Sequence, residues 1–185
     1  ARMATIVVPF RREHAKRRFA PAPDGVRSAL AHAMLEDVLA ACQAVGRTVL
    51  ATDGGQGQAV KAALREVEET SILVVNADLP CARPRDLLTL LGALPDGGLA
   101  LVAAADGTTN ALALAVPHLF APLYGPGSAE RFLARAARQE APAAIAQIPN
   151  LMDDADTLAD LERLEGRLGE HTAAALEELR TGLPR

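Results

Sequence analysis

Short apolar runs that end in turn residues alternate along this chain with longer stretches in which apolar residues recur every three or four positions. The short runs predict β-strands, and the longer stretches predict helices that pack one face on a sheet. The predicted strands cover residues 5–8, 48–51, 72–78, 99–104, 110–116 and 143–148. The predicted helices cover residues 26–41, 58–69, 84–94, a stretch that begins near Ala129, 158–168 and 170–180.

This alternation of strands and helices predicts an α/β fold in which a mostly parallel sheet is flanked by helices. No internal repeat or linker divides the sequence, so we expect residues 1–185 to form a single domain. Asp24 and Ser128 stand where side chains cap helices. Thr157 and Asp160 have the spacing of a capping box.

The central strand carries the most informative pattern in the chain. The apolar run 72–75 is uninterrupted, as in a strand buried on both faces of a parallel sheet, and it leads to Asp78 and Pro80. Pro80 cannot donate to a strand ladder, so the strand stops at Asp78 or just before it. Asp78 then lies at the carboxyl edge of the sheet, where α/β folds bind ligands and where a carboxylate suits Mg²⁺. The alternative is that Asp78 only caps the turn.

Two further charged clusters follow predicted strands. Asp153, Asp154 and Asp156 come after the last strand and can therefore lie at the same sheet edge as Asp78. Five cationic side chains lie in the loop after the first strand, where an α/β protein would hold phosphates. Taken singly, the acidic cluster is typical of a helix N-terminus and the basic run of a solvated surface. Together they indicate metal-assisted phosphoryl or nucleotidyl transfer.

Composition narrows the class of protein further. The chain has a net charge of −4, which argues against a general nucleic-acid binder, and its core must be Ala, Leu and Val because aromatic residues are only 3%. Two cysteines without metal-ligand spacing indicate a reducing compartment. We see no leader or membrane-spanning run and therefore expect a cytoplasmic protein. The Ala- and Leu-rich C-terminal helices are compatible with a homodimer.

Seven short motifs occur in the order seen in one enzyme family. They are Val8-Pro9, Ala15-Lys16-Arg17-Arg18, Ala33-Met34-Leu35-Glu36-Asp37-Val38-Leu39, Ala77-Asp78-Leu79-Pro80, Thr109-Asn110-Ala111-Leu112, Gly125-Pro126-Gly127-Ser128 and Asp154-Ala155-Asp156-Thr157. In these motifs the chain resembles the phosphoenolpyruvate and 2-phospho-L-lactate guanylyltransferases of deazaflavin coenzyme F-420 biosynthesis. The resemblance implies a nucleotidyltransferase fold of the nucleotide-diphospho-sugar transferase type, with Mg²⁺ as cofactor and GTP as substrate.

The resemblance also implies roles for individual residues. Asp78 and Asp154 match metal ligands that take part in catalysis, with Asp156 as a further ligand candidate. Residues that match the site of the phosphorylated three-carbon acid are Thr109, Gly125 and Ser128. Residues that match the nucleotide site are Pro9, Arg11, Lys16 and Arg18 near the triphosphate, with Lys16 also catalytic, and Thr52 and Asp53 near the base or ribose.

The sequence leaves several alternatives open. Residues 68–71 pass directly into the central strand, where the family has an additional strand and a Gly-Leu-Asn-type segment that helps to hold the nucleotide. The choice of guanine over adenine therefore stays open. The choice between phosphoenolpyruvate and 2-phospho-L-lactate also stays open, because the two acids differ only in saturation at the carbon next to the carboxylate. Alternative functions are a nucleotide-binding or regulatory module that has lost turnover, and a molybdopterin-type guanylyltransferase, although the glycine-rich loop of the latter is missing.

Overall fold

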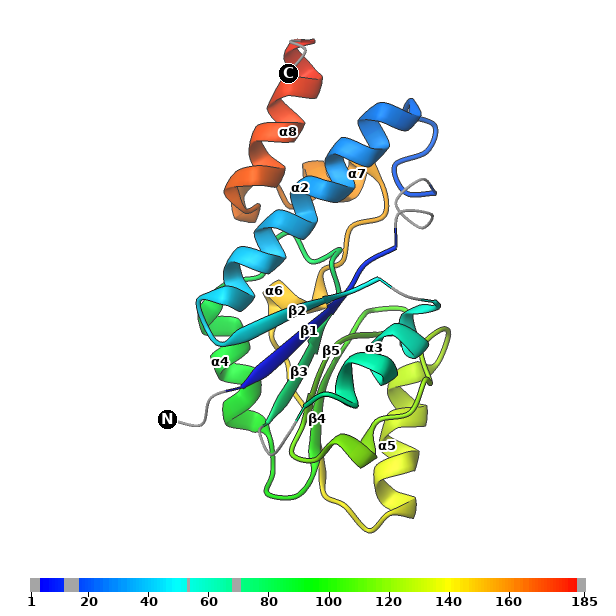
Figure 1. Ribbon diagram of the computed structural model, residues 1–185. Helices are drawn as coiled ribbons and strands as arrows, with labels where there is room; N and C mark the ends of the chain where they lie inside the picture. Colours follow the sequence, from blue (N-terminus) through cyan, green and yellow to red (C-terminus); the bar gives the residue numbers. More distant parts are fainter. Residues whose placement is uncertain (1–3, 12–16, 53, 68–70, 183–185) are drawn as a thin grey trace.

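A six-stranded sheet forms the centre of the molecule, in the order β2-β1-β3-β5-β4-β6 (Figure 1). The structure is a computed structural model and describes residues 4–11, 17–52, 54–67 and 71–182. The strands are β1 (Thr5–Pro9), β2 (Arg47–Ala51), β3 (Ile72–Val75), β4 (Leu99–Ala103), β5 (Thr109–Leu114) and β6 (Ala143–Ile145). β5 runs antiparallel to both of its neighbours and the other pairs are parallel. The predicted α/β fold with a mostly parallel sheet is confirmed.

The reversal of β5 follows from the short connection that precedes it. Residues 104–108 join β4 to β5, and Gly107 has a φ of 80°, which favours glycine in a tight turn. A parallel neighbour would require a crossover of a dozen or more residues. Because β5 is reversed, its first residues, Thr109 and Asn110, lie at the same edge of the sheet as the end of β3, and the Asn76 N–H donates to the Asn110 carbonyl at 3.0 Å.

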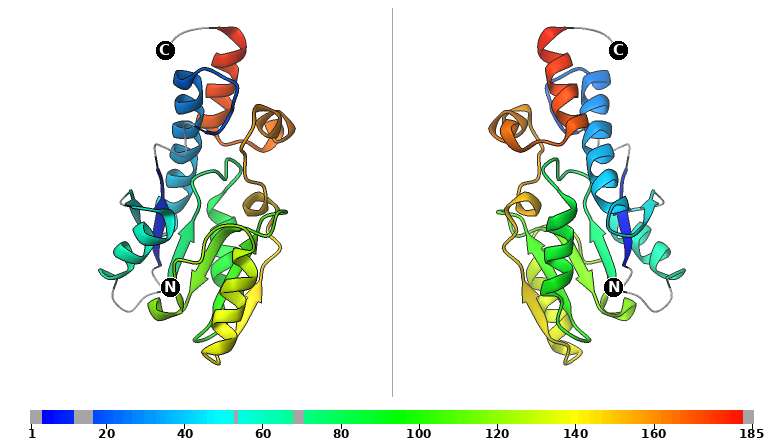
Figure 2. Two further views of the ribbon diagram at one scale, coloured as in Figure 1. Left: turned by 90° about the vertical axis from the view of Figure 1, so that its right-hand side faces the viewer. Right: turned by 90° about the vertical axis from the view of Figure 1, so that its left-hand side faces the viewer.

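Helices cover both faces of the sheet (Figures 1 and 2). One face packs against α2 (Asp24–Gln43), α4 (Pro84–Ala93) and α6 (Pro149–Met152), and the other against α3 (Gln56–Leu64), the 3₁₀ turn η1 (Pro117–Leu119) and α5 (Ser128–Arg138). The alternation of strand side chains decides which residues face which layer. In β3, Leu73 and Val75 join the α2 and α4 core, whereas Ile72 and Val74 join the α3 and α5 core.

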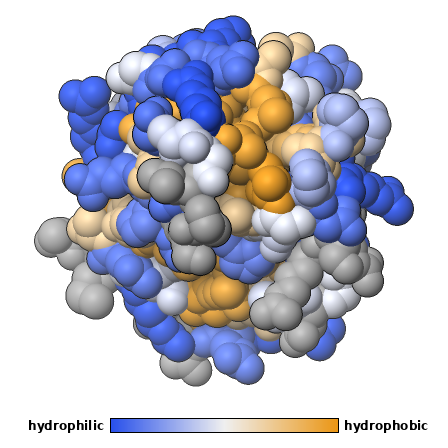
Figure 3. Space-filling model, turned by 90° about the horizontal axis from the view of Figure 1, so that it is seen from above, coloured by the Kyte–Doolittle hydropathy of each residue, from blue (hydrophilic) through white to orange (hydrophobic). Residues whose placement is uncertain are grey.

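A third apolar cluster lies beyond the sheet. Here α7 (Leu158–Arg163) and α8 (Glu170–Thr181) pack with α2, burying Phe19, Met34 and Leu176. The 3₁₀ turn η2 (Glu165–Arg167) connects α7 to α8. Figure 2 shows α8 running alongside α2. Figure 3 looks down on this end of the molecule and shows an apolar area (orange) between hydrophilic side chains. None of the helices in the described part of the chain is both long and apolar enough to span a membrane.

Several predicted boundaries were wrong. The helix predicted at 58–69 ends at Leu64. The strand predicted at 143–148 ends at Ile145, and after residues 146–148 the short helix α6 begins at Pro149. Pro149 explains this second change, because proline favours the first turn of a helix. The stretch 158–168 is divided into α7 and η2.

Two of the three predicted caps were also wrong. The N-cap of α2 is Pro23, and the Asp24 carboxylate pairs with Arg27. The N-cap of α5 is Gly127, and Ser128 is the first helical residue. The capping box at α7 is confirmed, since the Asp160 N–H donates to the Thr157 hydroxyl at 3.1 Å and the Thr157 N–H donates to the Asp160 carboxylate at 3.0 Å.

Candidate functional site

Three carboxylates from two distant parts of the sequence meet at the edge of the sheet. Asp78, Asp154 and Asp156 each offer an oxygen atom, and these oxygen atoms lie within 4.8 Å of one another. We call this group the acidic triad. Asp78 is buried, with 6% of its surface exposed, whereas the side chain of Asp156 is 61% exposed. Such a group of hard oxygen donors, open on one side, has the chemistry of a site for a divalent cation.

Backbone hydrogen bonds fix the two segments of the acidic triad against each other. The N–H of the buried Ala155 donates to the Asp78 carbonyl at 3.0 Å, so the residues on either side of Ala155 are held beside Asp78. On the other side, the Phe19 N–H donates to the Asp156 carbonyl at 2.8 Å. The amide of Asn110 donates to the Asp154 carboxylate at 3.3 Å. The acidic triad is therefore positioned by main-chain contacts as well as by its own side chains.

Asp153 belongs to a different set of contacts. Its carboxylate pairs with Arg167 at 2.8 Å and with Arg163 at 3.6 Å, and it is not among the residues of the acidic triad. The Arg167 guanidinium also donates to Asn150, whose amide donates to the buried Asp86 at 2.9 Å. The three neighbouring aspartates therefore have different roles: Asp153 belongs to a structural network, whereas Asp154 and Asp156 belong to the site.

Among the described residues, Arg18 is the cation that contacts the acidic triad. Its guanidinium pairs with Asp78 Oδ2 at 2.6 Å and with Asp156 Oδ1 at 3.4 Å. The second oxygen of Asp78, Oδ1, is buried and has no hydrogen-bond partner in the described part of the chain. A buried carboxylate oxygen without a partner costs free energy unless something binds it. The residues therefore fit a metal ion, which would bind that oxygen.

Burial and mutual repulsion raise the pKa values of two carboxyl groups of the acidic triad. Burial, followed by the nearby negative charge of Asp78, raises the pKa of Asp154 above its ordinary value. Burial also raises the pKa of Asp156, although the Arg18 guanidinium acts in the opposite direction. A bound cation would remove the repulsion that raises these pKa values.

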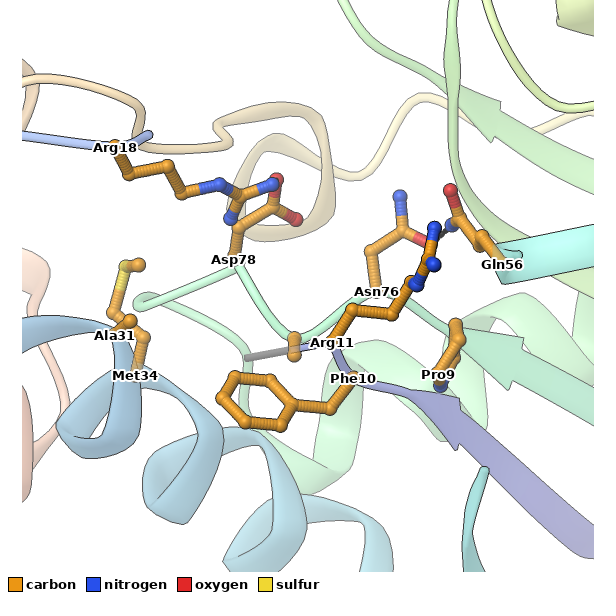
Figure 4. A pocket seen from close by; sticks show the side chains of 10 residues that line it. Pro9, Phe10, Arg11, Arg18, Ala31, Met34, Gln56, Asn76 and Asp78 are labelled. Carbon is orange, nitrogen blue, oxygen red and sulfur yellow. Dashed lines mark hydrogen bonds and ion pairs between the residues drawn. The ribbon is translucent and has the colours of Figure 1, made fainter. Parts of the chain in front are cut away.

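A pocket opens beside the acidic triad (Figure 4). Its polar lining comes from Arg11, Arg18, Gln56, Asn76 and Asp78, and its apolar lining comes from Pro9, Phe10, Ala31, Met34 and Ala77. The figure shows the Arg18 guanidinium directed at the Asp78 carboxylate, while Arg11 extends toward Asn76 and Gln56. Three residues predicted for the nucleotide, Pro9, Arg11 and Arg18, thus lie together in one pocket.

Two amide side chains in this pocket were missed from the sequence. Gln56 Nε2 donates to Asn76 Oδ1 at 2.8 Å, and Asn76 Nδ2 donates to the Thr109 carbonyl at 3.0 Å. Asn76 lies two residues before Asp78 at the end of a buried strand, which was a usable signal. Gln56 opens α3 after two glycines and carries no comparable pattern.

A second hollow adjoins this pocket through Phe10 and Arg11. It measures ≈ 580 Å³ and is lined by Phe10, Arg11, His32, Leu35, Leu50, Thr52 and Gly54. Its size and largely apolar walls are typical of small-molecule sites. Thr52, predicted near the base or ribose, lines it. Lys16 and Asp53, the other two residues predicted for the nucleotide, lie outside the described residues.

The residues predicted for the three-carbon acid lie on the other side of Asn76. The hydroxyls of Thr109 and Ser128 are 3.0 Å apart and buried. Ser128 opens α5 after the turn that contains Gly125, which has a φ of 112°. One hydrogen bond between two hydroxyls uses one of their two hydrogens, which leaves the other to donate to an anion. Arg131, missed from the sequence, donates to the carbonyls of Leu123 and Pro126 and holds this turn.

Comparison with known proteins now decides the family. A model described as the MobA-like NTP transferase domain matches residues 12–178 of this chain. The chain belongs to this family. Two relatives named phosphoenolpyruvate guanylyltransferase support the same assignment. The protein from Streptomyces scabiei is 32% identical over 95% of this chain and 96% of its own length, and the protein from Roseiflexus castenholzii is 35% identical over 91% and 90%. The resemblance predicted from the motifs is confirmed, and the protein is a nucleotidyltransferase.

Solved structures confirm the predicted fold. A candidate nucleotide-diphospho-sugar transferase from Desulfovibrio desulfuricans G20 superposes with a TM-score of 0.68 and covers 96% of this chain and 95% of its own, at 13% sequence identity. The nucleotidyltransferase also differs from its relatives in length. The alignment with the Streptomyces scabiei protein extends over 211 residues, more than the 185 of this chain, so that relative carries segments without a counterpart here.

Proposed function

We propose that the protein transfers GMP from GTP to the phosphate group of phosphoenolpyruvate or 2-phospho-L-lactate and releases pyrophosphate. The observation that carries this proposal is the acidic triad at one edge of the sheet. Its residue Asp78 lines the pocket of Arg11 and Arg18, and its residue Asp154 accepts a hydrogen bond from Asn110, the neighbour of Thr109. The names of the relatives supply the nucleotide and one acceptor. The product would be the GDP-activated three-carbon intermediate of coenzyme F-420 biosynthesis.

The acidic triad would hold Mg²⁺, with Asp78 and Asp154 as ligands and Asp156 as a third candidate. When bound, the ion would stabilise the negative charge that develops around the α-phosphorus. A phosphate oxygen of the acid attacks the α-phosphorus, and the bond from that phosphorus to the bridging oxygen breaks as pyrophosphate leaves. Because a phosphate oxygen is already anionic at neutral pH, no general base is needed. The chain therefore acts mainly by positioning and by charge.

Cationic side chains would hold the triphosphate. Arg11 and Arg18 line the pocket next to Asp78, and Lys16 matches the same basic loop of the family. Guanidinium groups suit this role because they donate two parallel hydrogen bonds to phosphate oxygens. Thr52 lines the adjoining hollow, which has room for a base and ribose, and Asp53 follows it in the chain.

The three-carbon acid would bind at the start of α5. The hydroxyl hydrogen left over by the Thr109 and Ser128 pair would donate to its phosphate or carboxylate, together with a backbone N–H of the turn at Gly125. Thr109 is connected to the acidic triad by its neighbour Asn110, whose amide donates to the Asp154 carboxylate, and the Thr109 carbonyl accepts a hydrogen bond from Asn76. These contacts would orient the attacking phosphate toward the metal.

A nucleotide-binding module without turnover is the second candidate function. It is favoured by the short connection between α3, which ends at Leu64, and β3, which begins at Ile72, because the family places part of the nucleotide site there. A pyrophosphate-release assay with Mg²⁺, GTP or ATP, and phosphoenolpyruvate or 2-phospho-L-lactate decides between the two. Release that requires GTP and one acid supports the transferase and identifies its acceptor. No release from folded protein that binds GTP supports the module.

A further inference from the structure

Arg18 stands where a metal ion would bind. Its guanidinium pairs with Asp78 and Asp156, two of the three carboxylates of the acidic triad, and it does so with 27% of its side chain exposed. The same side chain lines the neighbouring pocket, which carries Arg11, Gln56 and Asn76. Arg18 is thus within reach of two kinds of anionic partner: the carboxylates of the acidic triad and the phosphates expected in the pocket.

The main chain next to Arg18 is held in place. Phe19 is fully buried in the cluster of α2, α7 and α8, and its N–H donates to the Asp156 carbonyl at 2.8 Å. The backbone at this point is therefore tied to the acidic segment. Any change of partner by Arg18 requires only rotation of its long side chain.

A divalent cation and the Arg18 guanidinium compete for the same carboxylates, those of Asp78 and Asp156. The contact of 2.6 Å with Asp78 Oδ2 is a close charge-assisted hydrogen bond, and Asp78 Oδ1 is the buried oxygen without a partner. A metal ion held by the acidic triad would lie close to this guanidinium, and two cations so close together would repel each other. Metal binding is therefore less favourable while Arg18 stays on these carboxylates.

We infer that Arg18 is a placeholder cation that neutralises the acidic triad before the metal binds and moves to the nucleotide phosphates when it does. This inference rests on the proposed function only for the identity of the second partner. The exchange keeps the carboxylates neutralised and delivers a guanidinium to the triphosphate. It makes metal and nucleotide binding favour each other, because each is more favourable once Arg18 has changed partners.

The test is calorimetric titration of the whole protein with Mn²⁺ in the absence of nucleotide. Mn²⁺ is the probe because it prefers the same oxygen ligands as Mg²⁺. Arg18→Gln removes the competing charge and should bind Mn²⁺ at least about tenfold more tightly than the wild type. Arg17→Gln is the matched control, since it removes the same charge from the exposed neighbouring position, and its affinity should stay within about twofold of the wild type. Asp78→Asn should lose the binding.

These Mn²⁺ affinities test the role of Arg18 independently of whether the protein has transferase activity. Unchanged or weaker Mn²⁺ binding by Arg18→Gln overturns the placeholder role, whatever the pyrophosphate assay shows. Equal tightening in Arg17→Gln also overturns it, because the effect is then one of overall charge.

A second variant and a crystal structure complete the test. Arg18→Met, which keeps the apolar stem of the side chain, replaces the glutamine variant if the latter is unfolded by circular dichroism. A crystal structure of the wild type with Mn²⁺ alone should show the guanidinium out of hydrogen-bonding distance of Asp78. A guanidinium that stays on Asp78 beside the bound metal contradicts the exchange.

Discussion

The carboxylate of Asp37 in α2 accepts two hydrogen bonds from Thr172 in α8, one from the backbone N–H at 2.8 Å and one from the hydroxyl at 2.6 Å. Its other oxygen accepts a hydrogen bond from the His171 N–H at 3.0 Å. A buried residue of one helix thus caps the N-terminus of another helix that follows 135 positions later. Only glycine fits at position 169, because a Cβ there would overlap the Asp37 carboxylate.

A main-chain hydrogen bond connects this cap to the loop that follows Asp78. The Gly169 N–H donates to the Pro80 carbonyl at 2.8 Å, two residues after Asp78. The contact between α2 and α8 therefore fixes the loop that carries the central carboxylate of the acidic triad. We attribute a structural role to Asp37 on these grounds.

Asp37→Ala should lower the free energy of unfolding by about 2–4 kcal/mol, because it leaves the Thr172 and His171 donors without their acceptor in a buried place. Urea denaturation measures this loss. Glu36→Ala is the control, since Glu36 is the exposed neighbour of Asp37, and it should change the stability by less than about 0.5 kcal/mol. Equal effects of the two substitutions would show that the cap contributes nothing specific.

Asp78→Asn should reduce kcat/KM at least about a hundredfold while the circular dichroism spectrum stays that of the wild type, because the amide weakens metal binding without changing the side-chain volume. Asp153→Asn is the matched control. It removes the carboxylate that precedes Asp154 in the sequence and pairs with Arg163 and Arg167 instead of joining the acidic triad. This variant should retain most of the activity. Near-normal turnover by Asp78→Asn would contradict the metal site.

The sequence was sufficient to predict the fold class and the place of Asp78. An uninterrupted apolar run closed by Pro80 has few interpretations other than a buried strand that ends at a sheet edge. The strand is β3, although it ends at Val75, three residues before the predicted limit at Asp78. The two distant acidic segments were also predicted to meet at that edge, and they do. Both predictions rest on local patterns with a direct physical cause: apolar runs must be buried, and proline cannot donate a hydrogen bond to a strand ladder.

The direction of β5 could not be predicted from its own residues. Apolar runs look alike whether a strand runs parallel or antiparallel, and direction depends on the connection that precedes the strand. The direction of β5 determines which of its residues lie at the site, because a parallel β5 would carry Thr109 and Asn110 to the opposite edge of the sheet. The resemblance to the family supplied Thr109, whereas hydrophobic periodicity could not.

The wrong prediction for Ser128 has a similar cause. A serine after Gly-Pro-Gly before a helix is typical of an N-cap, but Gly127 with a φ of 70° takes that position. The Ser128 hydroxyl is thereby released to meet Thr109, 19 residues away in sequence. Long-range partners of this kind, like the Arg18 contacts with Asp78, are absent from any local pattern.

Asp154→Asn should raise the melting temperature of the metal-free protein at pH 7 by a few degrees, while it weakens metal binding. The pKa of Asp154 is raised by burial and by the charge of Asp78, so its ionised form destabilises the folded state. Stability contributed by this group is present at low pH and is lost as the pH rises through the raised pKa. Thermal denaturation at several pH values in EDTA measures the difference.

The advantage of Asp154→Asn should shrink as the pH falls through the raised pKa of the wild-type carboxyl. It should be gone well below about pH 4, where this carboxyl is protonated in both the folded and the unfolded state. Added Mn²⁺ provides the control, because it should stabilise the wild type more than the variant. A variant that is less stable than the wild type at pH 7 in EDTA would show that the hydrogen bond from Asn110 outweighs the repulsion.

Ser128→Ala should raise the KM for the phosphorylated three-carbon acid about tenfold, the effect of one lost hydrogen bond to a charged group, and leave the KM for GTP within about twofold. The removed hydroxyl is one of the two that would share a hydrogen with the acid, and its loss leaves Thr109 without its partner. Steady-state kinetics with each substrate varied in turn measures both constants.

Thr108→Ala is the matched control for Ser128→Ala, because its hydroxyl bonds to Asp106 in the turn just before β5 instead of to Ser128. It should leave both KM values unchanged. An equal rise in both KM values with Ser128→Ala would indicate that the substitution disturbs α5 as a whole and would contradict a specific contact with the acid. A rise in the KM for GTP alone would place the nucleotide, instead of the acid, at the start of α5.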